Sequence, residues 1–294
     1  HPHTLTPSHP HTLTPSHPAT ASICACPPRN HRVKLCGMET DKIGVSKFDE
    51  YKRRRRRFAA LTAYDFPTTR RLDLLGIPLI LVGDSLGMVA LGYEDTTLVT
   101  MADIEHHLRA CARAKPKALL AADLPFGSYG TVASAVENSR RLVAAGAEAV
   151  KAEGGRAIGA QIRAIVAEGI PFIGHLGMLP QSVREEGGYR VKGKSDEERL
   201  SLLDDARELV DAGAFAVVLE LVRPAAAREI TEAISVPTIG IGSGPDCDAQ
   251  ILVTNDLLRT SPDYIPRHVP ETRIDVGAAG DAVISEWKRS IETE

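Results

Sequence analysis

Short apolar runs recur through the middle of the chain, and each is followed by a polar or glycine-containing loop and then by a stretch of helical periodicity. This alternation predicts strands and helices in turn, the pattern of a parallel sheet. The runs are almost continuously apolar, so both faces of the sheet are expected to be buried. The predicted strands are residues 58–62, 79–82, 118–122, 149–151, 171–174, 216–219 and 238–241, with 251–253 as a weak eighth.

The stretches of period 3.6 between these runs predict helices, and several of them end in Ala-Gly or Glu-Gly, which is typical of a helix C-terminus. A further helix is expected at 275–291, where apolar residues form a loose stripe that would pack on the sheet domain or on a neighbouring subunit. The other predicted helices are residues 101–114, 131–145, 156–168, 196–212 and 224–233.

Periodicity alone does not separate a closed barrel from an open doubly wound sheet. Polar side chains, however, stand at or just past the C-terminal end of six predicted strands. In a (β/α)8 barrel these ends converge on one mouth, where such enzymes place their chemistry, and a barrel typically needs roughly 250 residues. The sequence therefore favours a barrel. The strand-end residues are Asp65, Asp84, Asp123, Glu153, His175 and Glu220.

The N-terminal segment is unlike the rest of the chain. Residues 1–16 contain the string HPHTLTPS twice, and no Asp, Glu, Lys or Arg occurs before residue 29. We expect residues 1–37 to be a disordered low-complexity leader and residues 38–294 to form a single barrel domain with a C-terminal helix. Met38 is a candidate start, which would make the leader upstream sequence. Organelle import is an alternative, but its prolines and histidines spoil an amphipathic helix.

The overall composition favours a small-molecule partner in the cytoplasm. A hydrophobic content of 43% and a formal net charge of −3 give no reason to expect nucleic acid or a membrane surface. Five scattered cysteines indicate a reducing compartment, and the set Cys24, Cys26, His31 and Cys36 lacks the paired spacing of zinc sites. The basic run 52–57 is interpreted as a solvated helix end rather than a nucleic-acid patch.

Three of the strand-end carboxylates point to a metal. Asp84, Asp123 and Glu153 would repel one another in a shared mouth unless a cation joined them. Ligand sets made only of oxygen favour a hard ion such as Mg²⁺, or another divalent cation. The alternative is that one or two of them cap the helices that follow.

Lys151 lies two residues before Glu153, so both side chains would point to the same side of an extended strand. An unpaired ammonium inside a barrel is costly. Lys151 is therefore expected either to hold substrate oxygens or a developing enolate, or to form a structural pair with Glu153 or Asp123.

Glu220 is bounded by apolar residues, the environment of a carboxylate that transfers protons near neutral pH, although a buried pair with a Lys or Arg is the alternative. His175 is either a hydrogen-bond donor to substrate or a core histidine. Ser85 either binds a substrate carboxylate or caps a helix. The glycine loop at 240–244 matches neither the dinucleotide nor the Walker pattern, so a phosphate site there is weakly supported.

Seven strings of this sequence resemble, in order, the motifs of the ketopantoate hydroxymethyltransferase family. The resemblance runs from about residue 45 to 258 and implies a (β/α)8 barrel of the phosphoenolpyruvate mutase and isocitrate lyase-like kind. The strings are LTAYD (61–65), LVGDSLG (81–87), ADLPF (122–126), KAEGG (151–155), GHLGMLPQSV (174–183), GGYRVKG (187–193) and GIGSGPDCD (240–248).

The resemblance implies transfer of a hydroxymethyl group from 5,10-methylenetetrahydrofolate to 3-methyl-2-oxobutanoate, giving ketopantoate (2-dehydropantoate) in pantothenate and coenzyme A biosynthesis through a metal-bound enolate. By likeness, Asp84 and Asp123 would bind both the metal and, through it, the substrate. Glu153 would be a further ligand or would hold a ligand in place. A large homo-oligomer, a homodecamer in well-known members, is implied in the same way.

The resemblance also assigns the remaining roles: Ser85 and Lys151 would contact the oxo acid, His175 would lie close to it, and Glu220 would accept the proton. Three features depart from the family pattern: Ala249, Asn255 where a His is common, and the stretch after residue 258. Ala249 stands where glycine is common and would crowd the loop if positive φ were needed there, and the sequence after residue 258 follows the family poorly.

Two rival functions remain open on the sequence. An enzyme of the phosphoenolpyruvate mutase and isocitrate lyase group would use the same barrel and a metal-bound oxo acid without folate, but the strings at 174–183 and 187–193 do not indicate that group. A non-enzymatic scaffold would require loss of the folate site, for instance through Ala249, Asn255 where a His is common, and the divergent C-terminus. Retention of every proposed acidic ligand argues against a scaffold.

Overall fold

The computed structural model describes residues 41–261 and 264–292, which belong to one compact unit, Gly37–Glu294. The predicted leader and its candidate zinc residues lie outside the described residues. Within the described ranges, no helix has the length and apolar character needed to cross a bilayer.

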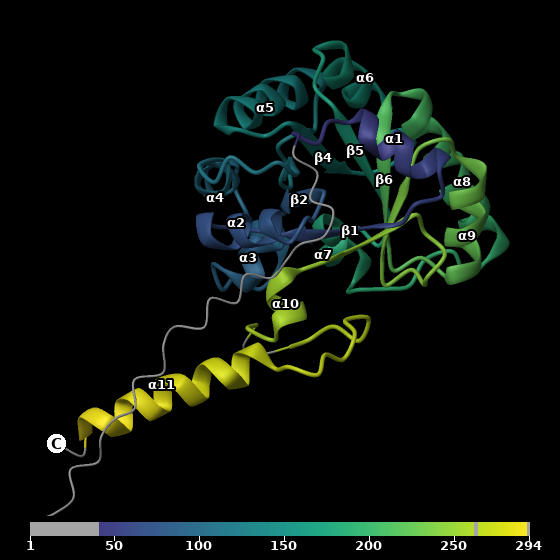
Figure 1. Ribbon diagram of the computed structural model, residues 1–294. Helices are drawn as coiled ribbons and strands as arrows, with labels where there is room; N and C mark the ends of the chain where they lie inside the picture. Colours follow the sequence, from purple (N-terminus) through teal and green to yellow (C-terminus); the bar gives the residue numbers. More distant parts are fainter. Residues whose placement is uncertain (1–40, 262–263, 293–294) are drawn as a thin grey trace, which may run out of the picture. The chain divides into compact units, whose positions relative to one another are not determined.

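Eight parallel strands form a closed barrel in sequence order, which confirms the predicted barrel (Figure 1). Closure is made by β1 and β8, where Phe58 pairs with Ala249 and Leu61 with Leu252. The weak eighth strand of the sequence is therefore real. The strands are β1 (Phe58–Thr62), β2 (Leu79–Val82), β3 (Leu119–Asp123), β4 (Ala149–Glu153), β5 (Phe172–Gly177), β6 (Ala214–Glu220), β7 (Thr238–Ile241) and β8 (Ala249–Leu252).

Helices connect successive strands except β7 and β8, which are joined by a loop, and several helices begin at the caps that their sequences supply. Thr100 and Thr131 each take part in a capping box, and Ser195 accepts a hydrogen bond from the backbone N–H of Glu198. The helices are α1 (Ser46–Arg53), α2 (Phe66–Leu74), α3 (Leu86–Val89), α4 (Met101–Ala112), α5 (Val132–Ala145), α6 (Gly159–Ala167), α7 (Val183–Glu186), α8 (Asp196–Asp211), α9 (Pro224–Ala233), α10 (Thr254–Leu258) and α11 (Val276–Glu292), with short 3₁₀ turns η1 (Thr96–Leu98), η2 (Arg156–Ile158) and η3 (Pro180–Ser182).

Helix α1 packs against the N-terminal end of the barrel and fills it with aromatic side chains. Phe48 is fully buried, with its ring centroid 5.2 Å from that of Phe58 and 5.7 Å from that of Phe215. Tyr51 stacks on Phe58 at 5.1 Å. The basic run begins in the last turn of α1, as expected for a solvated helix end, so the opposite end of the barrel is the one available for a site.

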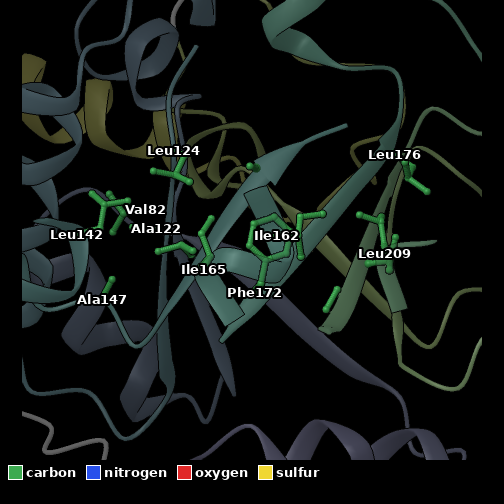
Figure 2. Close-up of a cluster of buried hydrophobic side chains, with 14 of the residues drawn as sticks. Val82, Ala122, Leu124, Leu142, Ala147, Ile162, Ile165, Phe172, Leu176 and Leu209 are labelled. Carbon is green, nitrogen blue, oxygen red and sulfur yellow. The ribbon is translucent and has the colours of Figure 1, made fainter. Parts of the chain in front are cut away.

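A second apolar layer lies between the barrel and its outer helices (Figure 2). Phe172 points outward from β5 and is fully buried together with Ile162 and Ile165 of α6. Leu209 of α8 belongs to the same layer. This packing on both faces explains why the strands lack alternation and fixes each strand against slippage, since a one-residue shift would reverse every side chain.

The differences from the predicted elements concern their ends. Strands β4, β5 and β6 extend further than predicted because charged or polar residues at their C-terminal ends continue the ladder. The helix expected at 156–168 is divided into η2 and α6, and the shorter helices α2, α3, α7 and α10 were not predicted. In each case the fold, rather than local periodicity, decides where the element stops.

Candidate active site

Strand alternation directs a set of polar side chains into the C-terminal mouth of the barrel. Along β4, Ala149 faces the barrel interior with Lys151 and Glu153, whereas Val150 and Ala152 face the outer helices. Lys151 and Glu153 are 4% and 5% exposed, so the sequence correctly predicts that they share a side of the strand. The same parity places Asp123, His175 and Glu220 at inward positions at the ends of β3, β5 and β6.

Two buried aspartates meet at the ends of β2 and β3. The backbone N–H of Asp84 donates to Oδ2 of Asp123 over 3.0 Å, and both residues are at most 5% exposed. Burial raises the pKa of Asp123 to about 6, with Lys151 opposing the rise and Asp84 adding to it. Burial also raises the pKa of Asp84, and the charge of Glu153 adds to that rise. Both carboxylates would be stabilised by a nearby cation.

Lys151 supplies one such cation. Its Nζ lies 3.0 Å from Oδ1 of Asp123 and 3.3 Å from Nδ1 of His175. Burial by itself lowers the pKa of Lys151, but the surrounding carboxylates, Asp123 first, outweigh burial and raise it above its usual range. Lys151 is therefore a charged ammonium in the mouth, and the Asp123 pair considered from the sequence is present.

His175 connects the acids on both sides of it. Its Nδ1 lies 3.5 Å from Oε1 of Glu153 and its Nε2 lies 3.3 Å from Oε2 of Glu220, both within ion-pair range. Nε2 is buried without a partner in hydrogen-bond geometry. Burial and Lys151 lower the pKa of His175, but Glu153 and Glu220 outweigh them and raise it to about 9. This histidine is linked to the site rather than to the apolar core.

Ser85 lies beside the mouth, whereas Asp65 lies outside it. Ser85 makes no capping hydrogen bond to α3, and its Oγ lies 2.8 Å from the hydroxyl of Tyr64 at the edge of the mouth. Asp65 accepts a hydrogen bond from the backbone N–H of Thr68, so it caps α2 and is exposed. Five of the six strand-end residues thus converge, and Asp65 does not join them.

The acidic cluster suits a divalent cation that is only partly enclosed by protein. Oδ1 of Asp123 and Oε1 of Glu153 are buried and accept no hydrogen bond, so both have capacity for a further positive partner. Among residues 41–261 and 264–292, no group of three or more His, Cys, Asp or Glu side chains is arranged to hold a metal ion, so at most two of these acids would bind it directly. Mg²⁺ commonly keeps several waters and takes only one or two carboxylates, which agrees with this arrangement.

The structure adds residues that the sequence did not single out. Gln181 donates its side-chain amide to Oδ2 of Asp84 over 2.7 Å, and its only sequence signal was membership of the string at 174–183. His268 lies against Gly242, where an added Cβ would be 3.3 Å from its ring. No periodicity or motif marks His268. It lies in the loop between α10 and α11, and only the tertiary fold brings it to the mouth.

The sequence model for ketopantoate hydroxymethyltransferase matches residues 42–294. The chain belongs to the ketopantoate hydroxymethyltransferase family. Curated relatives named 3-methyl-2-oxobutanoate hydroxymethyltransferase agree: that of Thermoanaerobacter sp. strain X514 is 50% identical over 79% of this chain and 85% of its own length, and that of Caldivirga maquilingensis is 48% identical over 84% and 94%.

Solved structures with this fold are more distant from this chain than those relatives. A phosphonopyruvate hydrolase in complex with oxalate and Mg²⁺ has a TM-score of 0.56 at 15% identity, covering 85% of this chain and 98% of that one. A 2,3-dimethylmalate lyase of the phosphoenolpyruvate mutase and isocitrate lyase superfamily has a TM-score of 0.52 at 15% identity, covering 84% and 86%. These likenesses establish the barrel type that the sequence predicts.

The structure places two of the departures from the family pattern, Ala249 and Asn255, within regular elements. Ala249 is the first residue of β8, is 1% exposed and does not have positive φ, so its Cβ packs in the barrel rather than crowding a loop. The family match continues to residue 294, well past the end of the recognisable motifs. Asn255 lies in α10, where its carbonyl oxygen accepts from Thr260.

Proposed function

We propose that the chain transfers a hydroxymethyl group to C3 of 3-methyl-2-oxobutanoate, giving ketopantoate for pantothenate biosynthesis. The activity is supported by relatives of that name at about half identity over most of the chain. The observation that carries the chemistry is the convergence of Lys151, His175 and Glu220 beside Asp84 and Asp123 in one barrel mouth. Among the described residues, none indicates a mutase or lyase reaction in place of this transfer.

In this proposal Glu220 takes the proton from C3 of the oxo acid onto a carboxylate oxygen. The electron pair of the broken C–H bond moves onto the keto oxygen. The ammonium of Lys151 stabilises the charge that develops there, because it is buried and already charged. His175, whose two ring nitrogens face Glu153 and Glu220, lies close to the substrate and holds these acids beside it, and Ser85 contacts the substrate carboxylate.

Asp84 and Asp123 would hold a divalent cation such as Mg²⁺, with Glu153 joined to it through water. Bound there, the ion would supply positive charge beside the keto and carboxylate oxygens and make the C3 proton more acidic. The same cation would favour the charged form of both aspartates.

The one-carbon donor in the proposal is 5,10-methylenetetrahydrofolate: once the proton has left, C3 attacks the methylene carbon as one of its C–N bonds breaks, and water then displaces the second nitrogen, which gives the hydroxymethyl group of ketopantoate and free tetrahydrofolate. We further propose a cytoplasmic homo-oligomer, a decamer by family resemblance. Its support here is the apolar face of α11, on which Val283, Ile284, Trp287 and Ile291 are each more than half exposed.

The experiment follows exchange of the C3 proton of 3-methyl-2-oxobutanoate with deuterium oxide by NMR, with and without Mg²⁺ and without folate. Wild type should exchange only with the metal, and Glu220→Gln should lose roughly 100-fold or more of the rate. Asp84→Asn should abolish the exchange that depends on Mg²⁺. The matched control is Asp65→Asn, a strand-end carboxylate outside the mouth, which should keep the exchange rate.

Two outcomes would contradict the proposal. One is absence of exchange in folded, metal-supplied wild type, and the other is exchange that survives in Glu220→Gln. Product formation on adding the methylene donor then tests the second half of the reaction. A protein that exchanges the proton but makes no ketopantoate would retain the deprotonation site and lack the transferase activity.

A further inference from the structure

Gln181 lies on η3 with only 4% of its surface exposed, beside the acidic cluster. Its Nε2 donates to Oδ2 of Asp84 over 2.7 Å and to the carbonyl oxygen of Leu124 over 3.0 Å. Both amide hydrogens therefore have acceptors. One of those acceptors is a carboxylate oxygen, which makes that hydrogen bond the stronger kind.

The opposite side of the same amide is held by Tyr129. The hydroxyl of Tyr129 donates to Oε1 of Gln181 over 2.6 Å. Reversing the amide would set its carbonyl oxygen against the carboxylate of Asp84 and its NH₂ group against the Tyr129 hydroxyl. The orientation of the Gln181 side chain is therefore fixed by three partners.

The backbone of Gln181 contacts a second acid. Its N–H donates to Oε2 of Glu153 over 3.0 Å. One residue thus contacts carboxylates from two different parts of the barrel, Asp84 after β2 and Glu153 at the end of β4. The contact engages one oxygen of Glu153, while Oε1 has no partner in hydrogen-bond geometry and faces Nδ1 of His175 at 3.5 Å.

We infer that Gln181 is a positioning residue that sets the orientation of Asp84 and Glu153 for the cation, an inference that rests on the proposed function. Carboxylates crowded in a buried site repel one another and tend to rotate apart or take up protons. Donors fixed on one oxygen of each acid oppose both tendencies. Groups that orient metal ligands in this way commonly change metal affinity by roughly 10–100-fold when removed.

The test measures Mn²⁺ affinity of the substrate-free protein by electron paramagnetic resonance of the free ion. Gln181→Met keeps the length of the side chain and removes its donors, so Mn²⁺ should bind roughly 10–100-fold more weakly. The matched control is Gln161→Met, because Gln161 is a half-buried glutamine whose Nε2 donates only to the carbonyl oxygen of Tyr129. Its Mn²⁺ affinity should equal that of wild type.

Thermal melting without metal shows which variants are folded. If Gln181→Met does not fold, Tyr129→Phe replaces it, since that change frees Oε1 of Gln181 and should weaken Mn²⁺ binding several-fold. Unchanged affinity in folded Gln181→Met, or in Tyr129→Phe where the first variant fails, would overturn the positioning role and leave the proposed function intact. A wild type that binds no Mn²⁺ would overturn the proposed metal site and this inference together.

Discussion

Lys151 and Asp123 form a buried ion pair whose energetics can be separated from catalysis. Asp123→Asn leaves the Lys151 ammonium buried beside a neutral amide, and breaking a buried pair in this way costs about 3–5 kcal/mol of unfolding free energy. The double variant Asp123→Asn with Lys151→Met removes both charges and should recover most of the loss. Urea denaturation with chelator present measures both. A single variant within about 1 kcal/mol of wild type would contradict the prediction.

His268 should make the stability of the fold depend on pH, because it is a partly buried histidine with a lowered pKa. Burial lowers its pKa below the ordinary value near 6.5, while Glu220 and Asp256 partly oppose the shift. As the pH falls through the ordinary histidine pKa near 6.5, the unfolded chain takes up a proton before the native state does, so the native state loses stability. His268→Gln should remove part of this loss. Denaturation at about pH 7.5 and about pH 5.5 checks it, and identical pH dependence in both proteins would refute it.

The sequence predicted individual mouth residues correctly where a polar side chain ended an apolar strand at an inward-facing position. Asp123, Lys151, Glu153, His175 and Glu220 were identified because each is polar at the end of an apolar strand, and the structure brings them together. Their catalytic and ligand roles stay predictions.

Asp65 was grouped with these residues although it caps α2. Gln181 and His268 were missed, because an uncharged amide in a loop and a histidine near the C-terminus have no periodic signal. Only tertiary structure brings them to the mouth.

Among the elements, β5 and β6 approach closely at Gly177, which pairs with Glu220. Its φ is +97°, and an added Cβ would lie 2.2 Å from the carbonyl oxygen of Glu220. Gly177→Ala should cost about 1–2 kcal/mol from the left-handed backbone and roughly 1–3 kcal/mol more from crowding, and should slow proton exchange by displacing Glu220. Gly169→Ala, with φ of +76° and open space around it, is the control for backbone strain alone.

Denaturation curves and exchange rates of the two glycine variants decide this prediction. Equal losses of stability would mean that β5 and β6 separate easily and that the close approach has no role. The alternation of strands and helices was predictable because strands such as β2, β3 and β4 are buried on both faces and therefore form almost continuous apolar runs. The extension of β5 to His175 and beyond was not predictable, since a polar residue at a strand end reads locally as a loop.

At the scale of the whole molecule, α11 is an amphipathic helix with no buried residue. If its apolar face packs on a second copy, Trp287→Asp should lower the assembly mass measured by sedimentation velocity, because a buried aromatic is replaced by a charge. Ser285→Asp introduces the same carboxylate on the opposite side of the helix and should leave the mass unchanged. An unchanged mass in Trp287→Asp would place the interface elsewhere.

Pairing of the first strand with the last has a consequence for synthesis on the ribosome. Until Ala249–Leu252 emerges, β1 and β7 are open edges able to pair with other chains. Translation at roughly 5–20 residues per second leaves β1 unpaired on that side for on the order of tens of seconds. Arrested nascent chains that end before residue 249 should be protease-sensitive and bound by chaperones, and chains that expose β8 should not. Resistance of the shorter chains would show that seven strands fold without closure.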